Sequence, residues 1–148
     1  MKRQKWLPGI LLAVLTLLVA ACTQAPRAAM PSEPASFTRN ADGYVDITVE
    51  QLASMLANKD FTLVNVHIPY DGEIPQTDQF IPFDQVAENL EKLPDKDAPI
   101  VLYCRSGSMS TTAAKALTAL GYTNVMEVDG GMRTWKAAGY ELLNEAHE

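Results

Sequence analysis

From residue 44 onward, continuous apolar runs alternate with segments in which apolar and polar positions recur periodically. Three short runs are nearly continuous in apolar and β-branched residues, as expected for strands that are buried on both faces. These runs cover residues 61–66, 99–103 and 124–128, and a further candidate strand covers residues 44–47. Between the runs, apolar residues recur three and four positions apart, which is the spacing of an amphipathic helix. The alternation predicts an α/β domain in which a parallel sheet is covered by helices on both faces.

Three helices are predicted from this spacing. The first begins at a capping box formed by Thr48 and Gln51, and the second is short, about two turns. The apolar positions that mark the three helices are Val49, Leu52, Ala53 and Leu56; Val86, Leu90 and Leu93; and Ala113, Ala116, Leu117 and Leu120, with Gly121 ending the last. Met132 and Trp135, three positions apart, are predicted to be core residues of a helix rather than ligand contacts.

The start of the chain departs from this pattern. A basic segment of five residues precedes an apolar stretch over residues 6–21. The uninterrupted part of that stretch, residues 10–21, is shorter than the roughly 20 residues that a membrane-spanning helix needs. This order is typical of a secretory signal segment, which we assign to residues 1–21 and exclude from the fold.

The residues that end this segment resemble the lipobox of bacterial lipoproteins. Val19-Ala20-Ala21-Cys22 consists of an aliphatic residue, two small residues and a cysteine, which in those proteins is acylated and becomes the first residue. The alternative is ordinary cleavage after an Ala-x-Ala pattern next to a cysteine. Several acyl chains on Cys22 would anchor the protein durably. The resemblance therefore implies a cell-envelope protein, held by lipid on the extracytoplasmic side of a membrane.

Residues 22–40 connect this anchor to the folded part of the chain. They are rich in proline and alanine and have no apolar periodicity, so we expect a flexible tether. The folded domain is then predicted to cover residues 41–148.

Charge and composition narrow the range of functions. The 148-residue chain has 12 basic and 18 acidic residues, and three of the basic residues but no acidic residue lie in residues 1–21. Loss of that segment changes the net charge from −6 to −9, with 9 basic residues left. Such a surface disfavours nucleic acid, and an anionic substrate would need a local positive site. His67 and His147 lie far apart in the sequence and far from Cys104, so we expect no zinc site. We also expect a monomer that needs no cofactor.

Cys104 is the residue on which chemistry is expected. It ends an apolar strand, and ligands of parallel sheets bind beyond the carboxyl ends of the strands. Gly107 permits a tight turn whose N–H groups converge on one point, and a helix beginning near Ser110 directs its positive end to the same point. A cysteine in this position is expected to be present substantially as thiolate. The alternative is a small, inert side chain at the end of a buried strand.

Tyr103-Cys104-Arg105-Ser106-Gly107 resembles the active-site loop of rhodanese-type sulfurtransferases, whose common form is Cys-Arg-x-Gly. Other segments are similar, in order, to further signatures of that family: Leu63-Val64-Asn65-Val66-His67, Gly72-Glu73-Ile74-Pro75, Ile81-Pro82, Gly130-Gly131-Met132-Arg133-Thr134-Trp135 and Gly139-Tyr140. The resemblance covers about residues 44–142 and implies a single rhodanese-like domain.

Three positions depart from the family pattern. Asn65 and His67 replace the family's aspartate and arginine, and Glu73 replaces its usual histidine. The roles of His67 and Glu73 and the physiological sulfur donor are therefore left open.

The resemblance implies a sulfane-sulfur transferase. Cys104 would take sulfur from a donor such as thiosulfate as a persulfide and pass it to a thiol, cyanide or a protein acceptor. The loop amides would hold the negative charge of that sulfur. Arg105 would supply local positive charge, or would simply be a solvated loop residue. The expected substrate-binding residues are Arg105, Ser106, Gly107, Ser108, Met109 and Ser110.

Three other functions are open at this point. A persulfide carrier would differ from the enzyme only in its acceptor, and a partner-binding module would use the same fold without turnover. A Cys-dependent phosphatase or arsenate reductase needs an arginine six residues after the cysteine to hold an oxyanion. Position 110 is serine, which disfavours the last of these functions.

Overall fold

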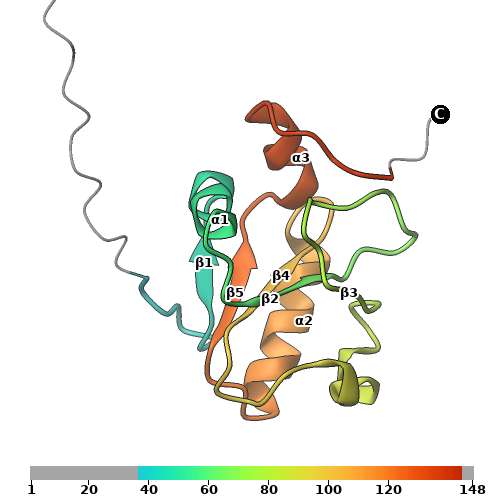
Figure 1. The fold of residues 1–148 in the computed structure, drawn as a ribbon. Coiled ribbons are helices and arrows are strands. Elements are labelled where there is room, and N and C mark those ends of the chain that lie inside the picture. The colour runs from blue at the N-terminus through green and yellow to red at the C-terminus, as the bar shows by residue number, and fades with distance from the viewer. Residues whose placement is uncertain (1–36, 145–148) are drawn as a thin grey trace, which may run out of the picture. The chain divides into compact units, whose positions relative to one another are not determined.

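A computed structural model describes residues 37–144 and contains the expected parallel sheet. The five strands run in the order β1-β5-β4-β2-β3, and every neighbouring pair is parallel (Figure 1). Their bounds are β1 Val45–Ile47, β2 Thr62–Asn65, β3 Gln79–Phe80, β4 Ile100–Tyr103 and β5 Val125–Val128. The α/β fold with a single parallel sheet is thus confirmed. The predicted signal segment, Cys22 and the first part of the predicted tether lie outside the described residues.

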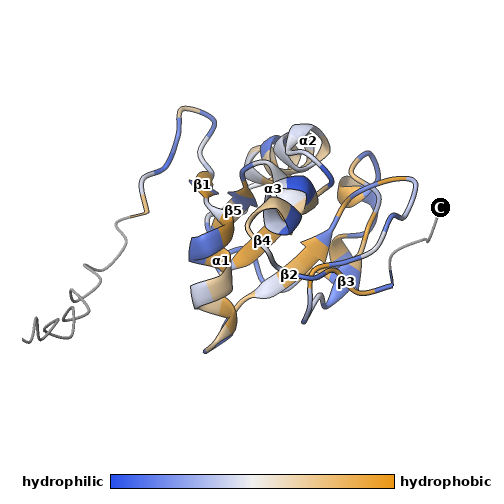
Figure 2. Cartoon of the chain, turned by 90° about the horizontal axis from the view of Figure 1, so that it is seen from above, coloured by the Kyte–Doolittle hydropathy of each residue, from blue (hydrophilic) through white to orange (hydrophobic). Residues whose placement is uncertain are grey.

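Helices cover both faces of this sheet. One face packs against α1 (Val49–Leu56) and α3 (Gly131–Ala137), and the other packs against α2 (Ser108–Ala119). Seen from above, α1 and α2 lie on opposite sides of the strands (Figure 2). The apolar residues of β4 are buried on both faces, which explains the continuous apolar run that predicted this strand. Met132 and Trp135 are buried in the α1/α3 layer, as predicted.

The capping box at the start of α1 is present as predicted. The Gln51 amide nitrogen donates to Thr48 Oγ1 at 3.2 Å, and the Thr48 amide nitrogen donates to Gln51 Oε1 at 2.8 Å. These two bonds satisfy backbone N–H groups that have no partner inside the helix. Local chemistry therefore determines where α1 begins.

The predicted helix over residues 86–93 is wrong in type. Two short 3-10 helices, η1 (Val86–Glu88) and η2 (Leu90–Lys92), stand in its place. Asn89 separates them with a φ of −124° and a ψ of 34°, and its side-chain Nδ2 donates to the Gln85 carbonyl at 2.9 Å. Asparagine competes in this way with the helical hydrogen-bond pattern, so the apolar spacing survives without a continuous α-helix.

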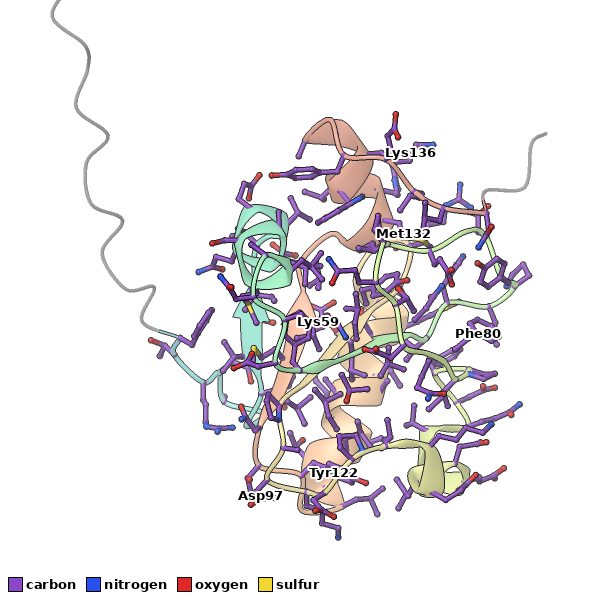
Figure 3. The ribbon with its side chains drawn as sticks, viewed as in Figure 1. Lys59, Phe80, Asp97, Tyr122, Met132 and Lys136 are labelled. Atoms are coloured by element: carbon purple, nitrogen blue, oxygen red, sulfur yellow. The ribbon has the colours of Figure 1, made fainter. Side chains whose placement is uncertain are left out.

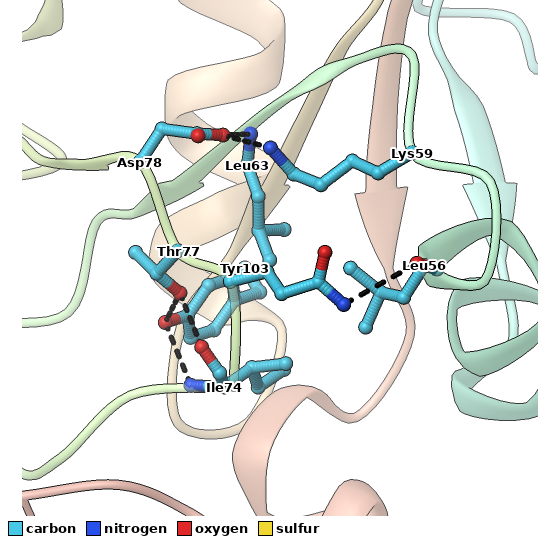
Figure 4. Close-up of polar contacts among 8 residues, drawn as sticks. Leu56, Lys59, Leu63, Ile74, Thr77, Asp78 and Tyr103 are labelled. Atoms are coloured by element: carbon cyan, nitrogen blue, oxygen red, sulfur yellow. Dashed lines mark hydrogen bonds and ion pairs between the residues drawn. The ribbon is translucent and has the colours of Figure 1, made fainter.

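The hydroxyl of Tyr103 fixes the carboxyl end of β4. The Ile74 amide nitrogen donates to Tyr103 Oη at 3.0 Å, and the hydroxyl oxygens of Thr77 and Tyr103 are 2.7 Å apart (Figure 4). On the neighbouring strand β2, the Leu63 amide nitrogen donates to Asp78 Oδ2 at 2.7 Å. Burial raises the pKa of Tyr103 far above its usual value, so the phenol stays neutral. The residue before Cys104 is therefore held in place by its own side chain.

Two residues at the end of the predicted tether contact the domain. Arg39 forms a β-bridge with Val45, and the Asn40 amide nitrogen donates to the Tyr44 carbonyl at 2.8 Å. Asn40 Nδ2 also donates to Asp46 Oδ2 at 2.9 Å. Between residues 37 and 144, no helix combines the length and apolarity required to cross a membrane.

Candidate active site

Cys104 lies at the carboxyl end of β4 and is 1% exposed. Two hydrogen-bond donors reach its sulfur. The Gly107 amide nitrogen is 3.1 Å from Sγ, and the Ser110 hydroxyl oxygen is 3.4 Å from Sγ. Both donors favour a negative charge on the sulfur. Of the amides in the fully described loop 105–110, the one that hydrogen-bonds to the sulfur is that of Gly107.

Gly107 makes the turn from the loop into α2. Its φ of 96° lies in the left-handed region that favours glycine, and it serves as the N-cap of α2. The helix begins at Ser108, two residues before the predicted start. The N-terminus of this 12-residue helix therefore lies next to the sulfur, where its partial positive charge stabilises an anion.

The first turn of α3 holds the backbone of the same loop. The Met132 amide nitrogen donates to the Cys104 carbonyl at 2.9 Å, and the Arg133 amide nitrogen donates to the Arg105 carbonyl at 3.0 Å. Gly131 allows this approach, since a Cβ atom there would lie 2.1 Å from the Cys104 carbonyl oxygen. Gly131, the first residue of α3, is thus part of the site, because it lets the backbone of α3 meet that of Cys104.

The remaining loop residues fall into two groups. Ser110 is buried and contacts the sulfur, whereas Ser106 and Ser108 are exposed. Met109 is half-buried and packs against the apolar cluster on the α2 side of the sheet. The structure thus brings Gly107 and Ser110 of the predicted binding set to Cys104, and it packs Met109 against the edge of the core.

Arg105 lines a cleft beside the loop. Its side chain is 61% exposed, and its Nε lies 3.6 Å from Asp71 Oδ2. The cleft has a volume of about 270 Å³, and its lining does not include Cys104. Met132 and Lys136 contribute to it from α3 (Figure 3). The residues that line it are Asp71, Arg105, Met132, Arg133, Lys136 and Leu142. Half of them are cationic, so the acidic domain has a local positive site here.

Two of the three residues that depart from the family pattern, Asn65 and Glu73, have side-chain hydrogen-bond partners. Asn65 is buried, its Nδ2 donates to the Gly72 carbonyl at 2.9 Å, and its Oδ1 accepts from the His67 amide nitrogen at 3.0 Å. Glu73 Oε1 accepts from Asn144 Nδ2 at 3.1 Å. Asn65 therefore fixes the loop after β2, and the Glu73 carboxylate is engaged with a late part of the chain.

His67 is buried, and the charges of Asp71 and Arg105 act on it. Its Nδ1 has no hydrogen-bond partner among the described residues. Burial lowers the pKa of His67, Asp71 raises it, and Arg105 lowers it. The net direction is downward, so the imidazole is neutral at pH 7.

Glu127 is a site residue that the sequence analysis missed. It lies on β5, is 3% exposed, and its Oε1 is 2.5 Å from the Ser110 hydroxyl oxygen. Burial raises the pKa of Glu127 to about 7, the Ser110 hydrogen bond opposes this shift, and Asp46 and Asp129 add to it. The available signal was a carboxylate inside an apolar strand, where an unpaired charge is costly.

Comparison with known protein families identifies the domain. Residues 48–138 match the family model of the "Rhodanese-like domain". The chain belongs to the rhodanese-like family. This confirms the resemblance drawn from the Cys104 loop and the ordered motifs around it.

Sulfurtransferases are among the relatives of this rhodanese-like domain. A sulfurtransferase of Allochromatium vinosum is 32% identical over 102 residues, which cover 66% of this chain and 94% of the relative. The thiosulfate sulfurtransferase GlpE of Pseudoalteromonas translucida is 28% identical over 100 residues, or 66% of this chain and 93% of GlpE.

Solved structures show the same fold. The crystal structure of a rhodanese-related protein of Thermoplasma volcanium matches with a TM-score of 0.59 and 27% identity, over 68% of this chain and 98% of that protein. A rhodanese-like domain protein of Staphylococcus aureus matches with a TM-score of 0.58 and 28% identity, over 69% of this chain and 98% of that protein.

Proposed function

We propose that this rhodanese-like domain transfers sulfane sulfur through a persulfide on Cys104. The observation that carries the proposal is the position of the sulfur at the start of α2, where the Gly107 amide donates to it and the Ser110 hydroxyl lies within hydrogen-bond reach. A thiolate and a persulfide are both anions, and the same donors stabilise both. The sulfurtransferases among the relatives support this assignment.

The proposed reaction has two displacement steps. The Cys104 thiolate attacks the outer sulfur of thiosulfate, a sulfur–sulfur bond forms, and sulfite leaves with the electron pair of the broken bond. An acceptor such as cyanide or a thiolate then attacks the outer sulfur of the persulfide and releases the Cys104 thiolate. No proton has to be transferred in either step, so the site must mainly hold a negative charge near Gly107.

The residue at position 110 supports sulfur transfer over phosphatase chemistry. Enzymes of the Cys-x5-Arg type place a guanidinium six residues after the cysteine to hold an oxyanion at two points. Ser110 occupies that position here, and its hydroxyl lies 3.4 Å from the Cys104 sulfur.

The cleft beside Arg105 suits an anionic donor. Arg105, Arg133 and Lys136 line it together with Asp71. The Arg105–Asp71 ion pair is long and solvent-exposed, and such pairs contribute little to stability. An incoming anion can therefore take the place of Asp71 beside the guanidinium.

The mass of the protein tests the proposed function. We expect thiosulfate to add about 32 Da, the mass of one sulfur atom, to the Cys22→Ser chain, in which Cys104 is the remaining cysteine. Cyanide should remove the added mass. Since Cys104 is 1% exposed, its loading requires the loop to open, and time courses should therefore be followed over hours. An unchanged mass, in a protein whose Cys104 is readily alkylated, would exclude the proposed function.

We also propose that Cys22 anchors the protein through acyl chains. The Val19-Ala20-Ala21-Cys22 sequence and the proline-rich segment after it support this. The chain expressed in a bacterium is expected to partition into the detergent phase of a phase-separation assay, and Cys22→Ser should move it to the aqueous phase. Cys104→Ser should leave the partition unchanged. A Cys22→Ser chain that is still cleaved before residue 22 and still membrane-bound would contradict the anchor.

A further inference from the structure

We propose that Glu127 is a positioning residue, which controls through Ser110 whether the sulfur of Cys104 has a hydroxyl donor. The proposal deepens the proposed function and rests on it, because Cys104 is taken as the reacting thiol. Glu127 acts on the sulfur through Ser110. Its carboxyl group is hydrogen-bonded to the Ser110 hydroxyl, and that hydroxyl lies within hydrogen-bond distance of the sulfur.

The Ser110 hydroxyl has more acceptors than it can serve. Its oxygen lies 2.5 Å from Glu127 Oε1, 3.0 Å from the Gly107 carbonyl oxygen and 3.4 Å from Cys104 Sγ. A serine hydroxyl carries one hydrogen and donates to one acceptor at a time. The protonation state of the carboxyl therefore decides which acceptor receives that hydrogen.

The two states of Glu127 have opposite effects on the sulfur. An ionised carboxylate is the strongest of the three acceptors, so it takes the Ser110 hydrogen and leaves the sulfur with the Gly107 amide. A protonated carboxyl donates its own hydrogen to Ser110 Oγ. The Ser110 hydrogen is then available to a negatively charged Cys104 sulfur. Ionisation of Glu127 thus removes a donor from the sulfur and adds a negative charge close to it.

The surroundings of Glu127 place this change near neutral pH. Burial is the main cause that raises its pKa to about 7, and the carboxylates of Asp46 and Asp129 act in the same direction. Asp46 is its register partner on β1, and Asp129 directly follows β5. From α2, Ser110 faces Glu127. The cation Lys115, also on α2, is ion-paired with Asp42. The thiol of Cys104 is the titratable group that faces the pair from the end of β4.

The rate of Cys104 alkylation against pH tests the proposal. Iodoacetamide would be used on the full chain carrying Cys22→Ser, from pH 5.5 to pH 9, with and without Glu127→Gln. The glutamine amide can donate to Ser110 Oγ at every pH. We expect Glu127→Gln to react about threefold to tenfold faster at pH 8 and equally fast, within about twofold, at pH 5.5. Superimposable profiles over the whole range would overturn the proposal.

Two further variants separate the link through Ser110 from a general charge effect. We compare the effect of Glu127→Gln on the logarithm of the alkylation rate at pH 8 with and without Ser110. In a Ser110→Ala background this effect should be less than about half of its size in the presence of Ser110. Asp46→Asn removes a neighbouring, exposed carboxylate that has no bond to Ser110, and should change the alkylation rate by less than about twofold. An equal effect of Glu127→Gln with and without Ser110 would overturn the proposal.

Thermal unfolding provides a second readout that does not depend on reactivity. The folded-state pKa of Glu127 is about 7, above its ordinary value of 4.5, so the folded state binds this proton more tightly. Wild-type stability is therefore lost as the pH rises from about 4.5 to about 7, and Glu127→Gln lacks this loss. Between pH 5 and pH 8, the Tm of the wild type should fall by at least about 5 °C relative to Glu127→Gln. If the difference in Tm between the wild type and Glu127→Gln were the same at pH 5 and pH 8, the titration of Glu127 between these pH values would be contradicted. Because no sulfur donor is used, both measurements stand whatever the persulfide experiment shows.

Discussion

Replacing Cys104 with serine is expected to reduce the rate of sulfur transfer from thiosulfate to cyanide by at least about a thousandfold. Serine keeps the hydrogen-bond partners of this position, the Gly107 amide and the Ser110 hydroxyl. An unactivated hydroxyl, however, does not form the sulfur–sulfur bond on which the proposed reaction depends. Thiocyanate formation measures the rate. Chemical denaturation should show a change in stability of less than about 1 kcal/mol, because the hydroxyl remains hydrogen-bonded.

The other cysteine provides the matched control. Cys22→Ser makes the same chemical change outside the domain and should leave the rate of thiocyanate formation within about twofold. If Cys104→Ser kept more than a tenth of the rate, the covalent role of Cys104 would be wrong. A loss of rate in both variants would point to a fault in the assay rather than to the site.

Replacing Gly131 with alanine is expected to destabilise the domain by about 3–5 kcal/mol. Its φ is +53°, and a Cβ atom would lie 2.1 Å from the Cys104 carbonyl oxygen and 2.9 Å from the carbonyl carbon. That carbonyl belongs to the backbone and accepts a hydrogen bond from the Met132 amide, so it cannot turn away as a flexible side chain could. Either α3 or the Cys104 loop must shift. Urea unfolding gives the stability, and the alkylation rate of Cys104 reports the displacement of the loop.

Gly139→Ala separates the steric clash from the cost of the backbone conformation. Gly139 has a φ of +89°, and no heavy atom lies within 4 Å of its Cβ position. Alanine there should cost only the left-handed conformation, about 1–2 kcal/mol. Equal costs at the two glycines would show that the approach of α3 to Cys104 has no energetic importance.

The parts of the fold that could be predicted from sequence depend on residues close in the chain or on burial of a whole strand. The apolar run that became β4 requires burial on both faces, and the Thr48–Gln51 capping box determines the start of α1 within four residues of chain. The family motifs extended this reading to the Cys104 loop. Its position at a strand end was accessible because parallel sheets place their ligands there.

The features that were missed depend on contacts between distant segments. β3 has two residues, so it has no periodicity and exists only through pairing with β2. The break at Asn89 arises from a side-chain bond to the backbone, which apolar spacing does not report. Glu127 belongs to the site because β5 lies beside β4 and carries its carboxyl to Ser110 on α2. A sequence shows a buried strand at this position, but not the neighbour that the carboxylate meets.

The order in which the chain is made gives the α3 contacts a further meaning. The carbonyls of Cys104 and Arg105 accept from amides of Met132 and Arg133, which are synthesised well after the loop and after β5. Until those residues exist, the carbonyl of the buried Cys104 lacks this hydrogen-bond partner. An incomplete chain therefore carries the cysteine without the hydrogen bonds that α3 makes to its loop. The thiol reaches its final environment only when the helix that follows the last strand has folded onto it.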